Sequence, residues 1–369
     1  MRVPRRPAAG LSVLAGLLAG VAVPAMASDF AVEWVDYNRG GPVPWDYIYQ
    51  IPFDEPSAAL GRPTVDTTDD PPPPGPETRL QTVVPVYPPF RIYPDFVTGE
   101  PIYELVSIGA GGWLTLRFDH PVENDPRNPA GIDFIVFGNY KCLLADGGRW
   151  DDGDPRLALI GSSQAVPENG IVSVSQTGLP GSWHTFADRP GYTAPKADGW
   201  PPTLGRVYRQ PVWPQTGFWG EPTDPTLPFN PALGPGSFAG LTVAEAAQRY
   251  GHSAGGTGFD LSDVGLDWIL YVRIENPPGS TRTPEIDAVS DVRPFPFPDL
   301  DWDTDVDEDD RTLFEACATG PAAGPVPPDC ARADFDGDGD IDQTDFGRLQ
   351  RCLSGPGRLA DLQCMGVTP

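Results

Sequence analysis

Residues 334–345 read DFDGDGDIDQTD, with aspartate at positions 1, 3, 5, 7, 9 and 12 of the stretch. Like charges at this density repel one another and keep a chain unfolded unless a cation lies among them. Residues 299–310 read DLDWDTDVDEDD and carry aspartate at the same six positions, and Cys317 and Cys352 follow the two stretches at the same distance. A duplicated unit with a period of 35 residues explains this agreement, whereas a solvated acidic tail does not.

The spacing of the aspartates is that of a calcium-binding loop. Calcium takes six to eight oxygen ligands, and a 12-residue loop supplies them from positions 1, 3, 5, 7, 9 and 12, with a backbone carbonyl at position 7 and often a water at position 9. The sequence therefore predicts two bound Ca²⁺ ions. The predicted ligands are Asp299, Asp301, Asp303, Asp305, Asp307 and Asp310 in the first loop, and Asp334, Asp336, Asp338, Asp340, Asp342 and Asp345 in the second.

The two loops differ at position 6, where a calcium loop turns sharply. The second loop has Gly339 there, and the first has Thr304, so we expect a more strained turn and a weaker first site. Val306 and Ile341 at position 8 are expected to pair hydrophobically between the loops. The proline-rich segments before the loops cannot hold a full helix, so a helix is expected only after each loop.

This duplicated loop-then-helix unit, over about residues 299–358, resembles a type I dockerin. The resemblance implies a small α-helical module that binds calcium and docks a secreted protein onto a cohesin-like protein or a cell-surface scaffold. Dockerins contact cohesin through loop positions 10 and 11 and the exit helices. Here these positions are Glu308-Asp309 and Gln343-Thr344, which differ from each other and from the Ser-Thr type pair of well-known cellulosomal dockerins.

Four of the five cysteines lie in this C-terminal part, and cysteines of an exported protein are expected to pair. Cys317 with Cys330 and Cys352 with Cys364 would each close a short loop behind a helix, and each bond would contribute roughly 3 kcal/mol. Pairing between the repeats is the alternative. A module with so small a core needs such disulfide cross-links and bound metal ions in order to fold. Cys142 is left over and is expected to be a buried free thiol.

Residues 1–27 have the pattern of a signal peptide, since Arg2, Arg5 and Arg6 precede an apolar run that ends before Ala25-Met26-Ala27. No later run is long enough to span a bilayer, so we expect a protein that is secreted or held at the cell surface, without membrane insertion. The net charge is −26, and residues 299–369 hold 17 acidic against 5 basic residues. This balance excludes a nucleic-acid partner, because phosphate binding needs clustered Lys and Arg.

The residues between the signal peptide and the acidic repeats are expected to fold as β-strands. Residues 113–118 (WLTLRF) alternate with the period of a half-buried strand, and residues 132–138 (IDFIVFG) and 267–275 (DWILYVRIE) are apolar on both faces, as in a sandwich core. Thr242 and Glu245 form a capping box, and Gly251 is placed to end that helix after Tyr250. Residues 189–240 are expected to be a long excursion over one sheet.

Five stretches of this part resemble an uncharacterised family of secreted bacterial surface β-sandwich proteins. They are PSAALGRPT (56–64), VSIGAGGWLTLRFDHPVEN (106–124), IDFIVFGN (132–139), GGTGFDLSDVGL (255–266) and EIDAV (285–289). The resemblance implies a jelly-roll-like sandwich and no known activity. The expected fold is thus mainly β. The expected parts are a β-sandwich domain (28–293), a Pro-rich linker (294–298) and a small α-helical, dockerin-like calcium-binding domain (299–369).

Catalysis is not expected. Residues 251–255 (GHSAG) match the G-x-S-x-G elbow of hydrolases, but a helix precedes the motif and no histidine follows Ser253. The three histidines are too scattered for a zinc site. A glycoside hydrolase needs only two carboxylates on facing walls and stays as an alternative.

The β part, residues 28–293, offers two further candidate sites. Trp200, Trp213 and Trp219 are candidate carbohydrate contacts, or else they cover the sheet as a second small core. A structural cation near Asp133, Asn139, Asp260 or Asp287 is a further hypothesis. We therefore expect a secreted, non-catalytic calcium-binding protein that carries a β-sandwich for recognition or structure. The alternative is a dockerin-carrying component of polysaccharide catabolism, either a glycoside hydrolase or a carbohydrate-binding module.

Overall fold

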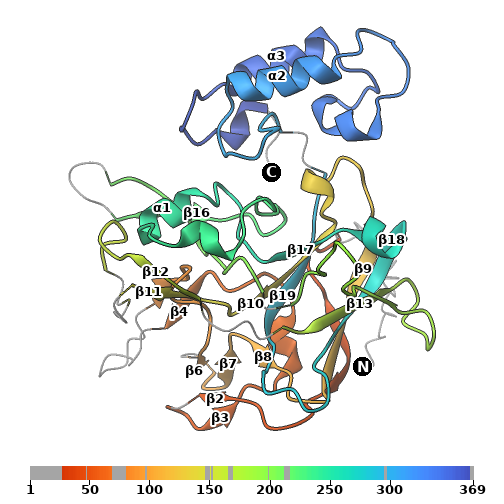
Figure 1. Cartoon of the computed structure of the whole chain (residues 1–369). Helices are drawn as coiled ribbons and strands as arrows, with labels where there is room; N and C mark the ends of the chain where they lie inside the picture. Colours follow the sequence, from red (N-terminus) through yellow and green to blue (C-terminus); the bar gives the residue numbers. More distant parts are fainter. Residues whose placement is uncertain are drawn as a thin grey trace, which may run out of the picture.

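The computed structural model describes residues 27–365, except 47, 69–79, 96–97, 146–149, 151–152, 165–168, 198, 212–216 and 295–296. The chain folds mainly as β-strands, as predicted, and every pair of named strands is antiparallel (Figure 1). Apart from Ala27, the predicted signal peptide lies outside the described residues. None of the described helices is long and apolar enough to cross a bilayer.

A five-stranded sheet has the order β1-β9-β18-β13-β14. Its strands are β1 (Glu33–Asn38), β9 (Trp113–Glu123), β18 (Trp268–Glu275), β13 (Ile171–Ser175) and β14 (His184–Thr185). The predicted strand WLTLRF begins β9, and Leu114, Leu116 and Phe118 are fully buried, as the alternation predicts.

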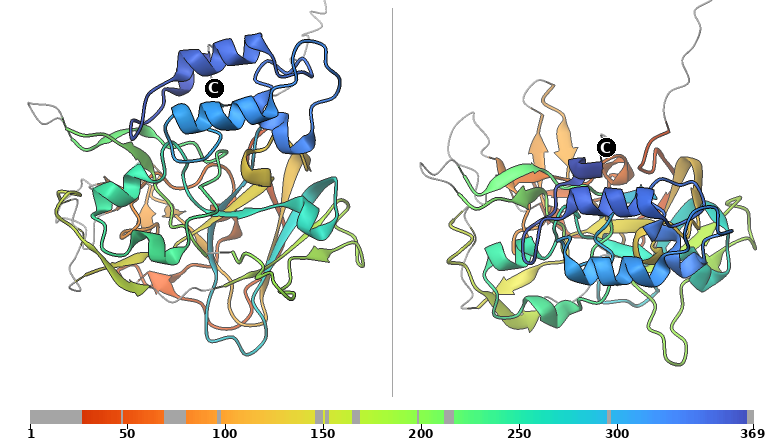
Figure 2. Two further views of the ribbon diagram at one scale, coloured as in Figure 1. Left: turned by 45° about the horizontal axis from the view of Figure 1, so that its top comes forward. Right: turned by 90° about the horizontal axis from the view of Figure 1, so that it is seen from above.

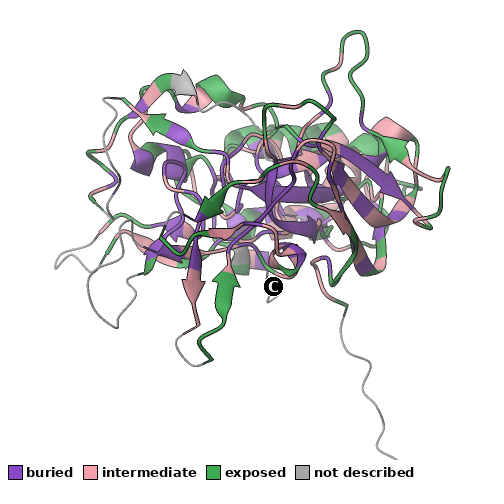
Figure 3. Cartoon of the chain, turned by 90° about the horizontal axis from the view of Figure 1, so that it is seen from below, coloured by how far each residue is buried: buried purple, intermediate pink, exposed green. Residues whose placement is uncertain are grey.

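A four-stranded sheet has the order β17-β10-β19-β8. Its strands are β17 (Thr257–Phe259), β10 (Phe134–Gly138), β19 (Glu285–Asp291) and β8 (Val106–Ser107). Phe134 and Val136 of β10 belong to the hydrophobic cluster that also contains the buried side chains of the five-stranded sheet. Ile135 and Phe137 belong to a separate cluster. Both faces of β10 are therefore buried, as predicted, and Figure 3 shows buried strands at the centre of the molecule.

The prediction for DWILYVRIE was wrong in one respect, because β18 is buried on one face only. Ile269, Val272 and Ile274 are fully buried, whereas Tyr271 and Arg273 are half-buried. The register with β9 shifts between Ile269 and Tyr271. Outside the core, the Arg273 guanidinium lies 4.3 Å from the ring centroid of Trp183, so a cation–π contact covers this face.

Shorter elements surround the two sheets. Five two-stranded hairpins are β2 (Trp45–Asp46) with β3 (Ile51–Pro52), β4 (Asp66–Thr68) with β5 (Leu80–Thr82), β6 (Ile92–Pro94) with β7 (Pro101–Tyr103), β11 (Cys142–Leu144) with β12 (Ile160–Gln164), and β15 (Arg206–Tyr208) with β16 (Trp219–Pro222). Four 3₁₀ turns are η1 (Pro56–Ala59), η2 (Pro129–Gly131), η3 (Pro235–Phe238) and η4 (Leu261–Val264).

The predicted helix is α1 (Val243–Gln248), and its capping box forms as predicted, since Glu245 N donates to Thr242 Oγ1 at 3.2 Å and Thr242 N donates to Glu245 Oε2 at 2.7 Å. The helix ends two residues earlier than predicted. Gly251 lies in the turn that follows, and its φ is +56°. Helix α1 and the hairpin β15–β16 pack together in a second large hydrophobic cluster. Residues 189–240 thus include a hairpin and part of a core of their own.

The C-terminal part contains α2 (Glu308–Cys317), η5 (Pro328–Ala333), α3 (Gln343–Cys352) and η6 (Leu362–Met365). Helices α2 and α3 lie side by side (Figure 2). A 3₁₀ turn, and not a helix, precedes the second loop. Every buried member of the third hydrophobic cluster lies at Phe297 or beyond, so this part has its own core. Phe297, although placed in the predicted linker, belongs to that core.

Candidate metal centre

The twelve predicted ligands lie in two loops, the first leading into α2 and the second into α3. Eleven of them belong to groups of three whose carboxylate oxygens lie within 4.8 Å of one another. The groups are Asp299 with Asp301 and Asp303, Asp305 with Asp307 and Asp310, Asp334 with Asp336 and Asp345, and Asp340 with Asp342 and Asp345. Asp338 is exposed and stands outside these groups, and its Oδ1 accepts from Asp340 N at 3.1 Å.

The carboxylates at position 12 join the two ends of each loop. Asp310 and Asp345 are fully buried. Asp310 accepts from Leu300 N at 2.6 Å and from Asp307 N at 2.8 Å, and Asp345 makes the equivalent bonds to Phe335 N at 2.7 Å and Asp342 N at 2.9 Å. Each loop is therefore closed by the residue that also stands in the first turn of the following helix.

The aspartates at position 9 have a second role that the ligand pattern does not reveal. Asp307 and Asp342 are the N-caps of α2 and α3, and each forms a capping box with the position-12 aspartate. The signal for this was in the sequence, because D-x-x-D before each helical segment has the spacing of a capping box. The folding of each loop is thus coupled to the folding of its helix through the same two carboxylates.

The turn inside each loop uses left-handed backbone at positions 4 and 6. In the second loop these residues are Gly337 and Gly339, with φ of +75° and +91°. In the first loop they are Trp302 and Thr304, with φ of +67° and +82°. Each such non-glycine residue costs about 1–2 kcal/mol. The strain predicted at Thr304 is confirmed, and the equal strain at Trp302 was missed although glycine stands at position 4 of the second loop.

Three buried carboxylate oxygens in the loops lack a hydrogen-bond partner among the described residues. They are Oδ1 of Asp299, Asp305 and Asp340, and Asp305 and Asp340 are only 2% and 9% exposed. A buried anionic oxygen without a donor is costly, and a cation is the partner that would offset the cost. Burial, with the neighbouring carboxylates, raises the pKa of Asp299 to about 7. Burial likewise raises the pKa of Asp310 to about 6. The oxygen-only donor set fits a hard cation such as Ca²⁺.

Each loop is bonded to the segment that follows the opposite helix. The carboxylate of Asp305 accepts from Gly357 N, and that of Asp340 accepts from Ala322 N at 2.5 Å. These position-7 side chains therefore join the two repeats in addition to lying beside the other ligands. The acceptors and donors are again 35 residues apart, so the two repeats bind each other reciprocally.

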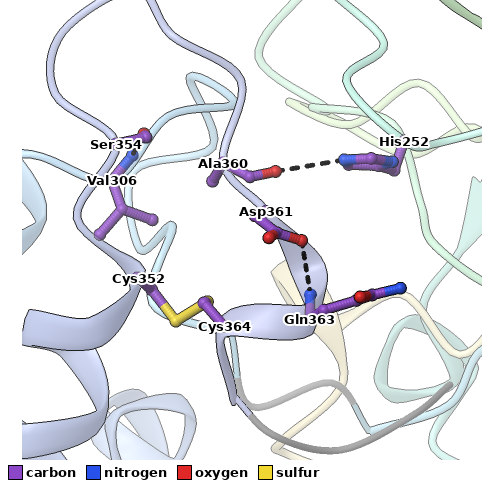
Figure 4. The surroundings of a disulfide bond; sticks show 8 residues. All are labelled: His252, Val306, Cys352, Ser354, Ala360, Asp361, Gln363 and Cys364. Atoms are coloured by element: carbon purple, nitrogen blue, oxygen red, sulfur yellow. Dashed lines mark hydrogen bonds between the residues drawn. A yellow bond between two sulfur atoms is a disulfide. The ribbon is translucent and has the colours of Figure 1, made fainter.

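The residues at position 8 add further hydrogen bonds between the two repeats. Val306 O accepts from Ser354 N at 3.0 Å, and Val306 N donates to Ser354 Oγ at 3.0 Å (Figure 4). Ile341 makes the same pair of bonds with Thr319, at 3.0 and 2.9 Å. Val306 and Ile341 are fully buried in one cluster, in agreement with the predicted hydrophobic pairing, while their backbones bind the opposite helix ends.

Disulfides hold the same helix ends. Cys317 bonds to Cys330 and Cys352 to Cys364, with Cα–Cα distances of 5.4 and 5.0 Å, and Figure 4 shows the second of these bonds. The pairing is therefore within each repeat, and the alternative of pairing between repeats is wrong. The bonds are compatible with an extracellular protein. Cys142 is a buried free thiol, as predicted, and burial raises its pKa to about 12, which makes it unreactive.

The aromatic residues suggested as carbohydrate contacts pack against the second hydrophobic cluster. Trp200 is half-buried there, and its indole Nε1 donates to Leu233 O at 2.7 Å. Trp219 packs edge-to-face on Tyr208, with ring centroids 5.9 Å apart. Trp213 lies outside the described residues. The two described rings therefore help to form a small core over the sheets, and a sugar contact through them stays a prediction.

The structural cation suggested for the β part finds no support in the geometry. Both oxygens of Asp133 accept from protein donors, Asn128 Nδ2 and Leu261 N, each at 2.8 Å. Both oxygens of Asp287 accept from Thr64, at 2.8 and 2.9 Å. Among the residues that the structure describes, no group of candidate metal ligands includes these aspartates. Buried carboxylates with complete hydrogen bonding need no ion.

The G-x-S-x-G match is a turn and not a nucleophile elbow. Ser253 is buried, and its Oγ accepts from Gly255 N at 3.0 Å. Nε2 of the adjacent His252 lies 3.2 Å from Ala360 O in the C-terminal part (Figure 4). The motif therefore stands at the contact between the two parts of the chain.

No family model matches the chain, and no curated protein matches it.

Proposed function

We propose that this chain is a secreted, non-catalytic calcium-binding protein whose C-terminal part binds two Ca²⁺ ions, one in each acidic loop. The observation that supports this best is the pair of buried Oδ1 atoms of Asp305 and Asp340, which stand at position 7 of the two loops and have no hydrogen-bond partner among the described residues. Each loop holds two groups of three carboxylates and closes onto the first turn of a helix. Without a cation, eleven grouped carboxylates would have to fold against their mutual repulsion.

Calorimetry of the full chain tests the metal sites. We expect two Ca²⁺ ions per chain, and Asp301→Asn and Asp336→Asn should each weaken one site at least tenfold, because each removes a charge at position 3 of one loop. Asp329→Asn is the matched control, since it removes an exposed carboxylate of the same part outside both loops. A stoichiometry of zero in the wild type, or equal losses in all three variants, would rule the proposal out.

The same proposal includes a role for each part. The C-terminal part is a dockerin-like module that docks the protein onto a cohesin-like partner or cell-surface scaffold through loop positions 10 and 11, and Glu308, Asp309, Gln343 and Thr344 are all exposed. The β part is a jelly-roll-like sandwich for recognition or structure, which the hydrophobic cluster shared by its two sheets supports.

Binding assays separate this role from the alternative. Purified type I cohesin titrated onto the full chain should bind only when Ca²⁺ is present, and no binding in either condition would remove cohesin as the partner. A glycan array and hydrolysis assays with the same chain should be negative. Turnover of a polysaccharide would instead support the glycoside hydrolase, and binding without turnover a carbohydrate-binding module.

A further inference from the structure

The two calcium loops differ in what their turns contact. Position 4 of the first loop touches the β part, since Trp302 O accepts from Asn230 Nδ2 at 2.9 Å. Asn230 is held for this contact, because its Oδ1 accepts from Ala232 N at 2.9 Å. In the second loop, the corresponding Gly337 is exposed, as is Gly339. Among the described residues, the turn of the first loop therefore contacts the β part, whereas the turn glycines of the second loop are exposed.

Thr304, at position 6 of the first loop, also contacts the β part. The Thr304 methyl group packs so closely on Gly251 that a Cβ atom there would lie 2.9 Å from Thr304 Cγ2. Thr304 O accepts from Ala360 N at 3.1 Å, and Ala360 O lies 3.2 Å from His252 Nε2 (Figure 4). A continuous path of contacts thus runs from the first loop through the C-terminal segment to the turn after α1.

The Trp302 side chain is held within the C-terminal part by Arg332. The Arg332 guanidinium lies 3.9 Å from its ring centroid, and Arg332 Nη2 donates to Asp299 O at 2.8 Å. Trp302 and Arg332 line a small cavity between the two parts together with Tyr250, His252 and Phe297. The first ligand, the strained turn and the β part therefore meet at one place.

This placement gives the side chains at positions 4 and 6 of the first loop contacts that the glycines of the second loop cannot make. Trp302 and Thr304 adopt left-handed backbone that glycine would adopt without strain, and both of them contact the β part. Resting on the proposed calcium function, we propose that the first loop is an intramolecular latch. Ca²⁺ bound there holds the strained turn in the shape that presents Trp302 and Thr304 to Asn230 and Gly251, and so fixes the C-terminal part on the β part.

The latch implies reciprocity, because two linked equilibria strengthen each other by the same factor. Docking should raise the calcium affinity of the first loop, and calcium should tighten docking. The second loop, whose turn faces solvent, should bind calcium without this linkage. The first loop is then an internal contact, and the turn of the second stays free for an external partner.

Hydrogen exchange on the full chain tests the latch. With CaCl₂ in place of EGTA, we expect the backbone amides of residues 225–232 and 249–253 to exchange at least tenfold more slowly, whereas those of β10 should not change. If calorimetry finds two bound ions and exchange at both segments is independent of calcium, the latch is wrong and the proposed function stands. If calorimetry finds no ion, the proposed function falls and the latch falls with it.

Variants locate the effect. Asp301→Asn should abolish the calcium-dependent protection of residues 249–253, and its second-loop counterpart Asp336→Asn should retain it. Asn230→Ala should lower the calcium affinity of the first site severalfold and leave the second unchanged. The double variant Trp302→Gly/Thr304→Gly should still bind two ions and lose the protection. Equal loss of protection in Asp301→Asn and Asp336→Asn, or an unchanged first site in Asn230→Ala, would overturn the latch.

Discussion

The β part and the C-terminal part of this chain are stabilised in different ways. Two antiparallel sheets in the β part bury aromatic and branched side chains in one large cluster. The C-terminal part has a smaller cluster, and it contains both disulfides found among the described residues. It also holds all the described groups of candidate metal ligands. A segment that buries little apolar surface needs cross-links and ions in order to fold.

The largest expected effect is the response to calcium removal. At a free Ca²⁺ concentration a thousandfold above Kd, each bound ion adds about 4 kcal/mol to the free energy of unfolding. We therefore expect calorimetric scans with EDTA to lose the transition of the C-terminal part, while the transition of the β part moves by only a few degrees. A scan in which EDTA shifts both transitions equally would show that the two parts are not separately stabilised.

Removal of a disulfide should act on the same part alone. Cys317→Ser/Cys330→Ser opens a closed loop with a sequence separation of 13 residues and should lower the free energy of unfolding of the C-terminal part by roughly 3 kcal/mol. Cys142→Ala is the control, because this thiol is free and packs in the β part. Urea denaturation followed separately for the two transitions gives both values. A larger loss in the β part than in the C-terminal part would contradict the comparison.

Sequence reasoning was most successful where one residue type must stand at a fixed spacing. The aspartates, the cysteine pairs and the capping box Thr242–Glu245 depend on local geometry, and the structure places them accordingly. The apolar periods of β9 and β10 likewise report directly on burial. Local rules of this kind transfer from one chain to another.

Most of the contacts that were missed join residues far apart in the chain. The bulge that turns Tyr271 outward depends on pairing with β9. The bonds of Val306 to Ser354 depend on how the two repeats meet. No local pattern in the sequence reveals that Asn230 donates to the backbone carbonyl of Trp302. Such pairings are decided by tertiary packing, which a single sequence does not display.

The two parts should respond to pH with opposite signs. Burial raises the pKa of Asp287 in β19 to about 7, well above the value of an unfolded chain. The folded β part therefore binds this proton more tightly, and the stability it contributes is complete below about pH 4 and is lost as the pH rises through 7, by at most about 1.4 kcal/mol per pH unit. Calcium ligands must be ionised, so the calcium-loaded C-terminal part should instead gain stability over the same range.

Thermal unfolding from pH 4 to pH 8 with saturating calcium measures both slopes. Asp287→Asn should flatten the slope of the β part, since an amide can still bond to Thr64 N and Thr64 Oγ1 without titrating. The slope of the C-terminal part should not change in this variant. Two transitions that move in the same direction with pH would show that the buried carboxylates of the β part do not govern its stability.

The smallest expected effect tests where the two parts meet. Gly251 and Gly279 both have positive φ, of +56° and +80°, so an alanine at either position should cost about 1 kcal/mol of backbone strain. A Cβ atom at Gly279 meets nothing within 4 Å, whereas at Gly251 it meets Thr304 of the first calcium loop. Gly251→Ala should therefore also weaken calcium binding at the first loop severalfold, and Gly279→Ala should leave it unchanged. Calorimetric titration of the two variants isolates the contact from the strain. Equal calcium affinities would mean that the β part and the first loop touch without influencing each other.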